Sequence, residues 1–379
     1  MACLLKAPNR TRKGCVTFTT QERDNVIRPS AEIRAQVEAL KTRYVVGLHH
    51  NWHDHQFRYD PLYDFSMAGD GDLIETDGKD FARIPLDACN FAPPCYSLSR
   101  GEPFWDIFCV ARAVNFKGIP EFFDAIRALY DSGRKPRVLF VCALPEIVEI
   151  PGIANLRQHF ENLFSPVERE HFVLLTIDWD YPFPLSAETL AFFYRSSKIF
   201  FHSAPQERRC RTAAYAWAGG MPVVANDEVA STLPRRWHRE PFLFRFEDPA
   251  DMPRALVAAL NGWSAPDRAW PAVRNEFSAD ASALRLDRWL AEEAARRGWG
   301  AISSRPINSN RLDLRLGRHH GLSVGGNRIA FSVQDFCKAL REKTDAEIRD
   351  ANALKDPEEA LAITETAPAK FGVLKRLFQ

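Results

Sequence analysis

Two basic residues stand where an apolar run gives way to a predicted helix. Arg112 and Lys117 belong to the segment ARAVNFKG (111–118). A phosphate bound there would meet two cations together with the free backbone N–H groups of a helix start. An ordinary solvated loop with two basic residues is the alternative, and this segment taken alone favours that alternative.

A second concentration of charge lies in the segment APQERRCR (204–211), between a predicted strand and a helix predicted over 206–219. The helix dipole favours Glu207 at a helix start, whereas Arg208, Arg209 and Arg211 in the same turn oppose the dipole. A bound anion would relieve that conflict. For any single arginine of the three, a place on a solvated surface is an equally good explanation.

The third feature is the turn WAGGMPVVA (217–225), in which two glycines end the predicted helix and Pro222 begins the next strand. Taken alone, it is a structural turn.

Histidines are concentrated in the segment HHNWHDH (49–55). His50 and His53, or His53 and His55, could point the same way, and imidazole is a ligand of zinc and iron. No second cluster of fixed spacing accompanies them, so we expect no metal site. A binding or catalytic loop that uses His50 and His53 is favoured over a metal site, and a plain surface loop is the alternative.

The elements around these segments alternate regularly. Continuous apolar runs predict buried strands, and the amphipathic segments between them predict helices. The strands are expected at 105–111, 137–142, 171–177, 198–203, 221–225 and 241–246, and the helices at 119–133, 153–164, 186–197, 206–219, 249–261 and 279–296. This alternation predicts a parallel, doubly wound sheet, in which ligands bind at the carboxyl ends of the strands.

The flanking sequences are less regular. A helix is predicted over 31–42 and a strand over 43–50, whereas the C-terminal part contains a predicted hairpin near Gly325 and a helix from Val333. We therefore expect three parts: a small N-terminal domain over 1–100, a Rossmann-like domain over 101–298 and a C-terminal extension over 299–379 that packs back on the first part.

The composition excludes several classes of protein. Hydrophobic residues make up 46% and charged residues 26%, as in a globular protein and not a disordered one. Lys and Arg total 50 against 49 Asp and Glu, so the net charge of +1 argues against a nucleic-acid partner. The eight cysteines form no CxxC pair, and no run approaches the roughly 18 apolar residues of a membrane span. We expect a cytoplasmic protein without a transmembrane segment, and peripheral contact with the inner face of a membrane is compatible with the sequence.

In order and spacing, the three charged and glycine-containing segments resemble the donor half of family 4 glycosyltransferases and their GT-B relatives. Arg112, Lys117 and Gly118 match the family's Arg and Lys around a loop that ends in Gly. Counted back from GMPVV, Glu207 falls at the first Glu of the family's pattern of two Glu separated by seven residues, and Tyr215 replaces the second. The match continues through PFLFRFEDPADMPRALVAAL and FSADASALRLDRWL, and it covers about half the chain.

The resemblance implies a GT-B-like α/β fold with a doubly wound, Rossmann-type donor domain. It implies a retaining hexosyltransferase-type enzyme (EC 2.4) that moves a sugar from a nucleotide-diphosphate sugar to a hydroxyl of a glycan or glycolipid, in bacterial surface polysaccharide or glycolipid synthesis. Arg112 and Lys117 would neutralise charge on the leaving diphosphate, and Glu207 would accept hydrogen bonds from the sugar. The remaining donor-binding residues would be Gly118, Arg208, Arg211 and Tyr215. No cofactor or metal is expected, because side chains do in this fold what a divalent cation does elsewhere.

Two departures from the family pattern keep a second hypothesis open. Tyr215 offers one hydroxyl where the family's Glu commonly holds the ribose, and only about 100 residues precede Trp105, where a full acceptor domain is expected. The rival is a non-catalytic sugar- or nucleotide-binding module, a pseudoenzyme of the same fold. Arg112, Lys117 and Glu207 together favour the enzyme, since binding alone would not need a paired cationic clamp.

Overall fold

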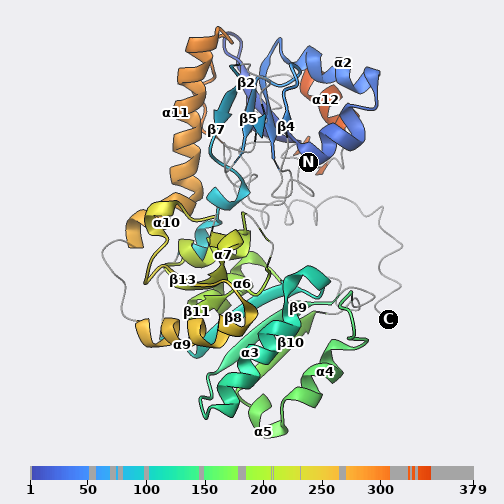
Figure 1. Cartoon of the computed structure of the whole chain (residues 1–379). Coiled ribbons are helices and arrows are strands. Elements are labelled where there is room, and N and C mark those ends of the chain that lie inside the picture. Colours follow the sequence, from blue (N-terminus) through green and yellow to red (C-terminus); the bar gives the residue numbers. More distant parts are fainter. Residues whose placement is uncertain are drawn as a thin grey trace. The chain divides into compact units, whose positions relative to one another are not determined.

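The chain forms two compact units in a computed structural model (Figure 1). Unit 1 comprises Met1–Pro85 with Ala283–Gln379, and unit 2 comprises Leu86–Ser282. The structure describes residues 2–50, 57–68, 74–75, 80–97, 102–144, 149–177, 185–205, 207, 209–230, 232–263, 270–307, 323–324, 327–328 and 332–342.

Unit 2 is built on a six-stranded sheet whose neighbouring strands are all parallel. Its strands are β8 (Trp105–Arg112), β9 (Val138–Ala143), β10 (Phe172–Ile177), β11 (Ser197–Phe201), β12 (Val223–Asn226) and β13 (Leu243–Phe246). Across the sheet they lie in the order β10-β9-β8-β11-β12-β13, so numbering them along the chain gives 3-2-1-4-5-6, the Rossmann arrangement. The strand order reverses between β8 and β11, which makes this pair the topological switch point.

Helices cover both faces of this sheet, because alternate strand residues point to opposite sides. On one face, Ile107 packs in a core that includes residues of α3 (Ile119–Asp131), α4 (Leu156–Leu163) and α9 (Met252–Gly262). On the other face, Phe108 packs in a core with residues of α6 (Ala187–Arg195), α7 (Arg211–Ala218) and α10 (Trp270–Phe277). Short helices α5 (Pro166–Arg169) and α8 (Asp227–Ala230) complete the set. The predicted α/β class with a doubly wound parallel sheet is confirmed.

Unit 1 has a smaller sheet in the order β1-β2-β3-β5-β7. Its strands are β1 (Cys3–Lys6), β2 (Gly14–Thr19), β3 (Tyr44–His49), β5 (Phe65–Met67) and β7 (Ala82–Ile84). All neighbours are parallel except β1, which is antiparallel to β2. The pair β4 (Phe57–Arg58) and β6 (Ile74–Glu75) is parallel, whereas β14 (Ser323–Val324) and β15 (Asn327–Arg328) form the predicted hairpin.

The helices of unit 1 come from segments that are far apart in the sequence. They are α1 (Thr20–Glu22), the π-helix η1 (Arg23–Ile27), α2 (Ala31–Leu40), α12 (Val333–Glu342) and the larger part of α11 (Ala279–Arg297). Helix α12 lies beside α2 (Figure 1). Phe336 of α12 packs edge-on against Phe18 of β2, with ring centroids 5.9 Å apart. Tyr44 donates a hydrogen bond of 3.4 Å to the Leu340 carbonyl. The last described helix therefore contributes to the core of unit 1.

The helix predicted over 206–219 is shorter than expected, since α7 begins at Arg211. Arg209 has a φ of 51°, in the left-handed region, and this conformation separates Glu207 from the helix. Glu207 is therefore not a helix-start carboxylate. The stretch 343–370 is charged and rich in alanine, a composition that predicts a surface helix, and it lies outside the described residues.

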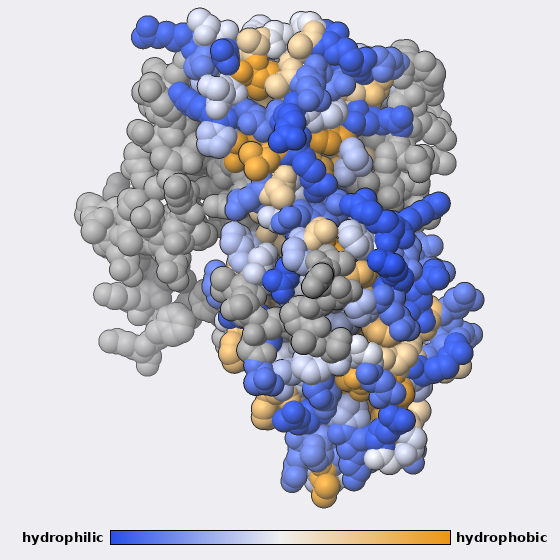
Figure 2. Space-filling model, turned by 90° about the vertical axis from the view of Figure 1, so that its left-hand side faces the viewer, coloured by the Kyte–Doolittle hydropathy of each residue, from blue (hydrophilic) through white to orange (hydrophobic). Residues whose placement is uncertain are grey.

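The surface drawn in Figure 2 is mainly hydrophilic, and its hydrophobic residues lie in small separate groups, as is usual for a face in contact with water. Among the described helices, none combines the length and apolar character needed to cross a membrane.

Candidate active site at the switch point of unit 2

The carboxyl ends of β8 and β11 bring the two charged segments of the sequence together. Strand β8 ends at Arg112, and Lys117 follows in the 3-10 turn η5 (Asn115–Lys117). Strand β11 ends at Phe201, and the chain then runs to Glu207. Because β8 and β11 are parallel neighbours, their following loops leave the sheet side by side at the switch point, where open α/β sheets bind ligands.

A close backbone approach fixes the two loops to each other. The Ser203 hydroxyl donates a hydrogen bond of 2.6 Å to the Lys117 carbonyl. Gly118 directly precedes α3 and has a φ of 59°, and a Cβ at this position would lie 2.5 Å from the Ser203 carbonyl oxygen. Only glycine fits both the conformation and the space. Gly118, which matches the glycine at the end of the family's loop, thus fixes the position of the preceding Lys117.

The central feature of the site is a buried cluster of three charged side chains. The Lys117 ammonium forms an ion pair with Oε2 of Glu207, and Nε2 of His202 lies 3.0 Å from the same oxygen. The side chain of His202 is 4% exposed, and those of Lys117 and Glu207 are 15% exposed. No group among the described residues hydrogen-bonds to Oε1 of Glu207, so this oxygen can accept from a ligand.

The cluster keeps both Glu207 and His202 charged at neutral pH. Burial raises the pKa of Glu207, but hydrogen bonds and charge from His202 and Lys117 outweigh it and lower the pKa to about 2. Burial lowers the pKa of His202, but neighbouring Cys210 and Glu207 outweigh it and raise the pKa to about 9. Lys117 and His202 then face the Glu207 carboxylate, with the sulfur of Cys210 close to His202.

Arg112 adds a further cation at the same edge of the sheet. It is the last residue of β8 and is exposed, and no carboxylate of the described residues pairs with it. The structure thus places Arg112 and Lys117 at the carboxyl end of one strand, and it joins Lys117 to Glu207 directly.

The arginines of the second segment have different surroundings. Arg209 forms an ion pair with Asp87 through Nε and donates a 2.9 Å hydrogen bond to Asn90, so its guanidinium stabilises the fold. A bound anion is not needed to explain it. Arg211 is the half-buried first residue of α7, and Arg208 lies outside the described residues.

Tyr215 is half-buried on α7, where its ring stacks on Tyr96 with centroids 4.3 Å apart and an interplanar angle of 19°. The turn after α7 is structural, as its sequence alone indicated. Gly220 has a φ of 68°, and the buried Trp217 indole donates a 2.9 Å hydrogen bond to the Phe242 carbonyl.

On the side of unit 1, His50 directly follows β3 and is 8% exposed. Burial, together with the charge of Arg23, lowers the pKa of His50 to about 3, so its imidazole is neutral at physiological pH. His53 and His55 lie outside the described residues.

One set of side chains resembles a metal site. Ligand atoms of His202, Glu207 and Cys210 all lie within 4.8 Å of one another, and imidazole, carboxylate and thiolate are ligands of zinc. However, the Lys117 ammonium already pairs with the Glu207 carboxylate, and a metal ion there would face this positive charge. The donor set therefore fits a metal only if Lys117 moves away.

Sequence reasoning missed His202 and Cys210. The signal for His202 was present, since it is a polar residue directly after the apolar run KIFF, at a strand's carboxyl end. Its contact with Glu207 depends on the loop between them.

Comparison with known proteins gives distant structural neighbours. No protein-family model matches the sequence, and no curated protein matches it. Among solved structures, the chain is similar to α,α-trehalose 6-phosphate synthase from Burkholderia multivorans, with 16% identity over 68% of each chain and a TM-score of 0.42. It is also similar to the catalytic domain of starch synthase IV from Arabidopsis thaliana bound to ADP and acarbose, with 17% identity and a TM-score of 0.36. That match covers 74% of this chain and 56% of the other.

Proposed function

We propose that the chain is a glycosyltransferase that binds a nucleotide-diphosphate sugar at the switch point of unit 2. The observation that carries the proposal is the buried cluster of Lys117, Glu207 and His202, with Arg112 at the same edge of a Rossmann sheet. A diphosphate suits this place because it meets cations and the N-terminal end of α3.

Each side chain has a defined task in the proposed transfer. The acceptor hydroxyl oxygen bonds to the anomeric carbon from the face that the diphosphate leaves, as the bond from that carbon to the diphosphate breaks, and the hydroxyl proton passes to the departing diphosphate oxygen. Arg112 and Lys117 stabilise the negative charge that develops on the leaving diphosphate. Oε1 of Glu207 accepts hydrogen bonds from hydroxyls of the transferred sugar, while its Oε2 is held by Lys117 and His202.

The finer assignments follow the family resemblance. They are retention of anomeric configuration, a hexosyl donor, no metal or other cofactor, and a glycan or glycolipid acceptor of a bacterial surface. In this scheme His50, as a neutral imidazole, and His53 serve the acceptor side, and the protein works in the cytoplasm or at the inner face of the membrane.

The rival is a binding module that has kept the fold without the reaction. Tyr215 favours it, because its ring is stacked on Tyr96 where the family has a ribose-holding carboxylate. The cations Arg112 and Lys117 beside Glu207 favour the enzyme, because a paired cationic clamp suits charge that develops on a leaving diphosphate, which binding alone does not need.

Release of nucleoside diphosphate from a donor distinguishes the enzyme from the binding module. The full chain is incubated with a panel of nucleotide sugars and mixed acceptors, with and without EDTA. We expect at least one donor to be consumed, and we expect EDTA to leave the rate unchanged. Binding of donors without any release would favour the module. Inactivation by chelator and recovery with zinc would instead make His202, Glu207 and Cys210 metal ligands.

A further inference from the structure

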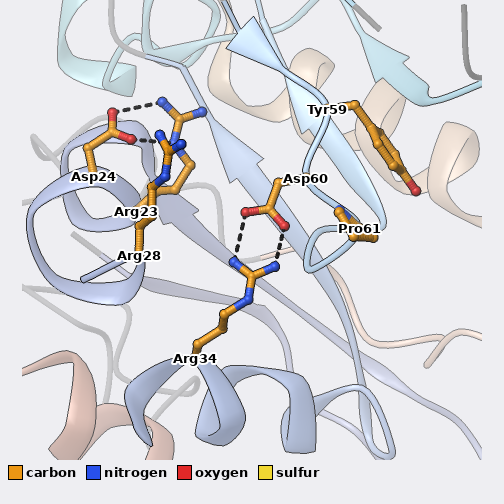
Figure 3. A pocket seen from close by; sticks show the side chains of 7 residues that line it. All are labelled: Arg23, Asp24, Arg28, Arg34, Tyr59, Asp60 and Pro61. Carbon is orange, nitrogen blue, oxygen red and sulfur yellow. Dashed lines mark hydrogen bonds and ion pairs between the residues drawn. The ribbon is translucent and has the colours of Figure 1, made fainter. Parts of the chain in front are cut away.

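Unit 1 contains a cavity of about 550 Å³ that has no part in the proposed reaction (Figure 3). Its wall comes from three segments: η1 with the residue that follows it, helix α2, and the loop between β4 and β5. The lining residues are Arg23, Asp24, Arg28, Arg34, Tyr59, Asp60 and Pro61.

The position of this cavity in the fold is one that binds ligands in other α/β proteins. Helix η1 is reached from the carboxyl end of β2 through α1, and His50 follows the carboxyl end of the neighbouring parallel strand β3. The charge of Arg23 acts on His50, which places η1 near that edge of the sheet. Crevices outside the carboxyl ends of parallel strands are the usual ligand sites of such sheets.

Two of the three arginines are held in fixed orientations. Arg34 reaches from α2 to Asp60 through Nη1 and Nη2, at 3.0 and 2.8 Å (Figure 3). Arg23 binds Asp24 through Nε and Nη2, at 2.8 and 2.7 Å. A guanidinium is planar and has five N–H donors. Each carboxylate accepts from two of these donors and thereby fixes the orientation of the whole group, which leaves the other N–H donors available.

Arg28 supplies the charge that these pairs leave uncompensated. It is exposed, and none of the carboxylates in the described residues pairs with it. Three guanidinium groups therefore face two carboxylates, so the wall carries one net positive charge.

We propose that this cavity binds a small polar molecule that carries a phosphate or carboxylate group. The oxyanion would lie against Arg28 and the outer N–H donors of Arg34, because guanidinium forks match both kinds of group. The volume lies within the range of small-molecule sites, and the polar wall disfavours an apolar ligand. The proposal concerns a site on unit 1 and holds whether or not unit 2 transfers a sugar.

The test uses the full chain and calorimetric titration with glucose 6-phosphate, glucuronate and glucose. We expect at least one of the two anionic sugars to bind roughly tenfold or more tightly than glucose, and to weaken as salt is raised from about 0.01 to 0.15 M. The better of the two identifies the anionic group. Equal affinity for glucose, or no binding of either anion, would overturn the proposal.

Arg28→Gln is the decisive variant, since Arg28 has no described partner whose loss could disturb folding. We expect it to weaken binding of the anionic sugar about threefold to tenfold. Arg10→Gln is the matched control, because Arg10 is an exposed arginine of the same unit outside the cavity wall. Equal losses of affinity in both variants would show that only the net charge of the protein matters, and this result would contradict binding in the cavity.

The affinity for nucleoside diphosphate is measured on the same samples, so that the outcome at the cavity can be told apart from an effect on the proposed transfer site. Arg28→Gln should leave that affinity unchanged. A parallel fall would assign the loss to a general defect and overturn the role of the cavity.

Discussion

At the scale of single residues, the account rests on Glu207. The family resemblance identified it from sequence spacing, because the count back from GMPVV does not depend on the local structure. Its surroundings were not predictable. The sequence suggested a carboxylate at a helix start, whereas the structure holds it between Lys117 and His202, ahead of α7.

Glu207→Gln tests this residue directly. The substitution removes a carboxylate that two cations share, so we expect the transfer rate to fall about 10- to 100-fold and the free energy of unfolding to fall by roughly 1–3 kcal/mol. Nucleoside diphosphate affinity should be kept or increased, since a negative charge near the phosphates disappears. The measurements are thermal or chemical unfolding, diphosphate affinity and transfer rate.

Glu121→Gln is the control, because Glu121 is an exposed carboxylate in the first turn of α3 and should contribute only about 0.3–1 kcal/mol through the dipole. If the two variants had the same small effect, Glu207 would be an ordinary surface carboxylate and the site assignment would fail.

His202 gives the cluster a pH dependence of defined sign. Its pKa is about 9 in the folded chain and near 6.5 when unfolded, so the protonated ring stabilises the fold fully below pH 6.5. This contribution declines between about pH 6.5 and 9. We expect the difference in unfolding free energy between the natural chain and His202→Gln to be largest near pH 6 and to shrink toward pH 9. A difference that stays constant over this range would show that folding does not raise the pKa of His202.

At the scale of helices and strands, the sequence was a good guide to unit 2. Strands buried on both faces require continuous apolar runs, and these runs are visible without any structure. The exception is the segment before α7. There Arg209 adopts a left-handed conformation and pairs with Asp87, and a contact across 122 positions of the chain leaves no local signal.

Gly118→Ala tests whether the loop contact positions Lys117. An alanine with positive φ costs roughly 1–2 kcal/mol by itself. At Gly118 the new Cβ would also meet the Ser203 carbonyl, so both stability and nucleoside diphosphate affinity should fall.

Gly133→Ala isolates the first effect, because Gly133 has a φ of 82° with nothing within 4 Å of the added Cβ. It should lose stability but keep its affinity. Similar affinity in the two variants would show that the close approach to Ser203 does not position the site.

At the scale of the whole molecule, each unit carries one charged site near the carboxyl ends of its parallel strands. The sequence indicated the site of unit 2, because charged residues stand directly after apolar runs. It did not indicate the cavity of unit 1, because Arg23, Arg34 and Asp60 come from three separate segments that only the fold brings together. The contact of Phe336 with Phe18 was equally hidden, since over 300 residues separate the two rings.

The most direct test of the central claim is the affinity for nucleoside diphosphate of the chain with Arg112→Ala and Lys117→Ala combined. Each replacement removes a charged contact of roughly 1.5–3 kcal/mol, so we expect a loss of at least about 10- to 100-fold. Arg134→Ala with Lys135→Ala is the matched control, since these exposed residues precede the amino end of β9 and should leave affinity unchanged. Unchanged affinity in the folded Arg112/Lys117 variant would contradict a diphosphate site at the switch point of unit 2.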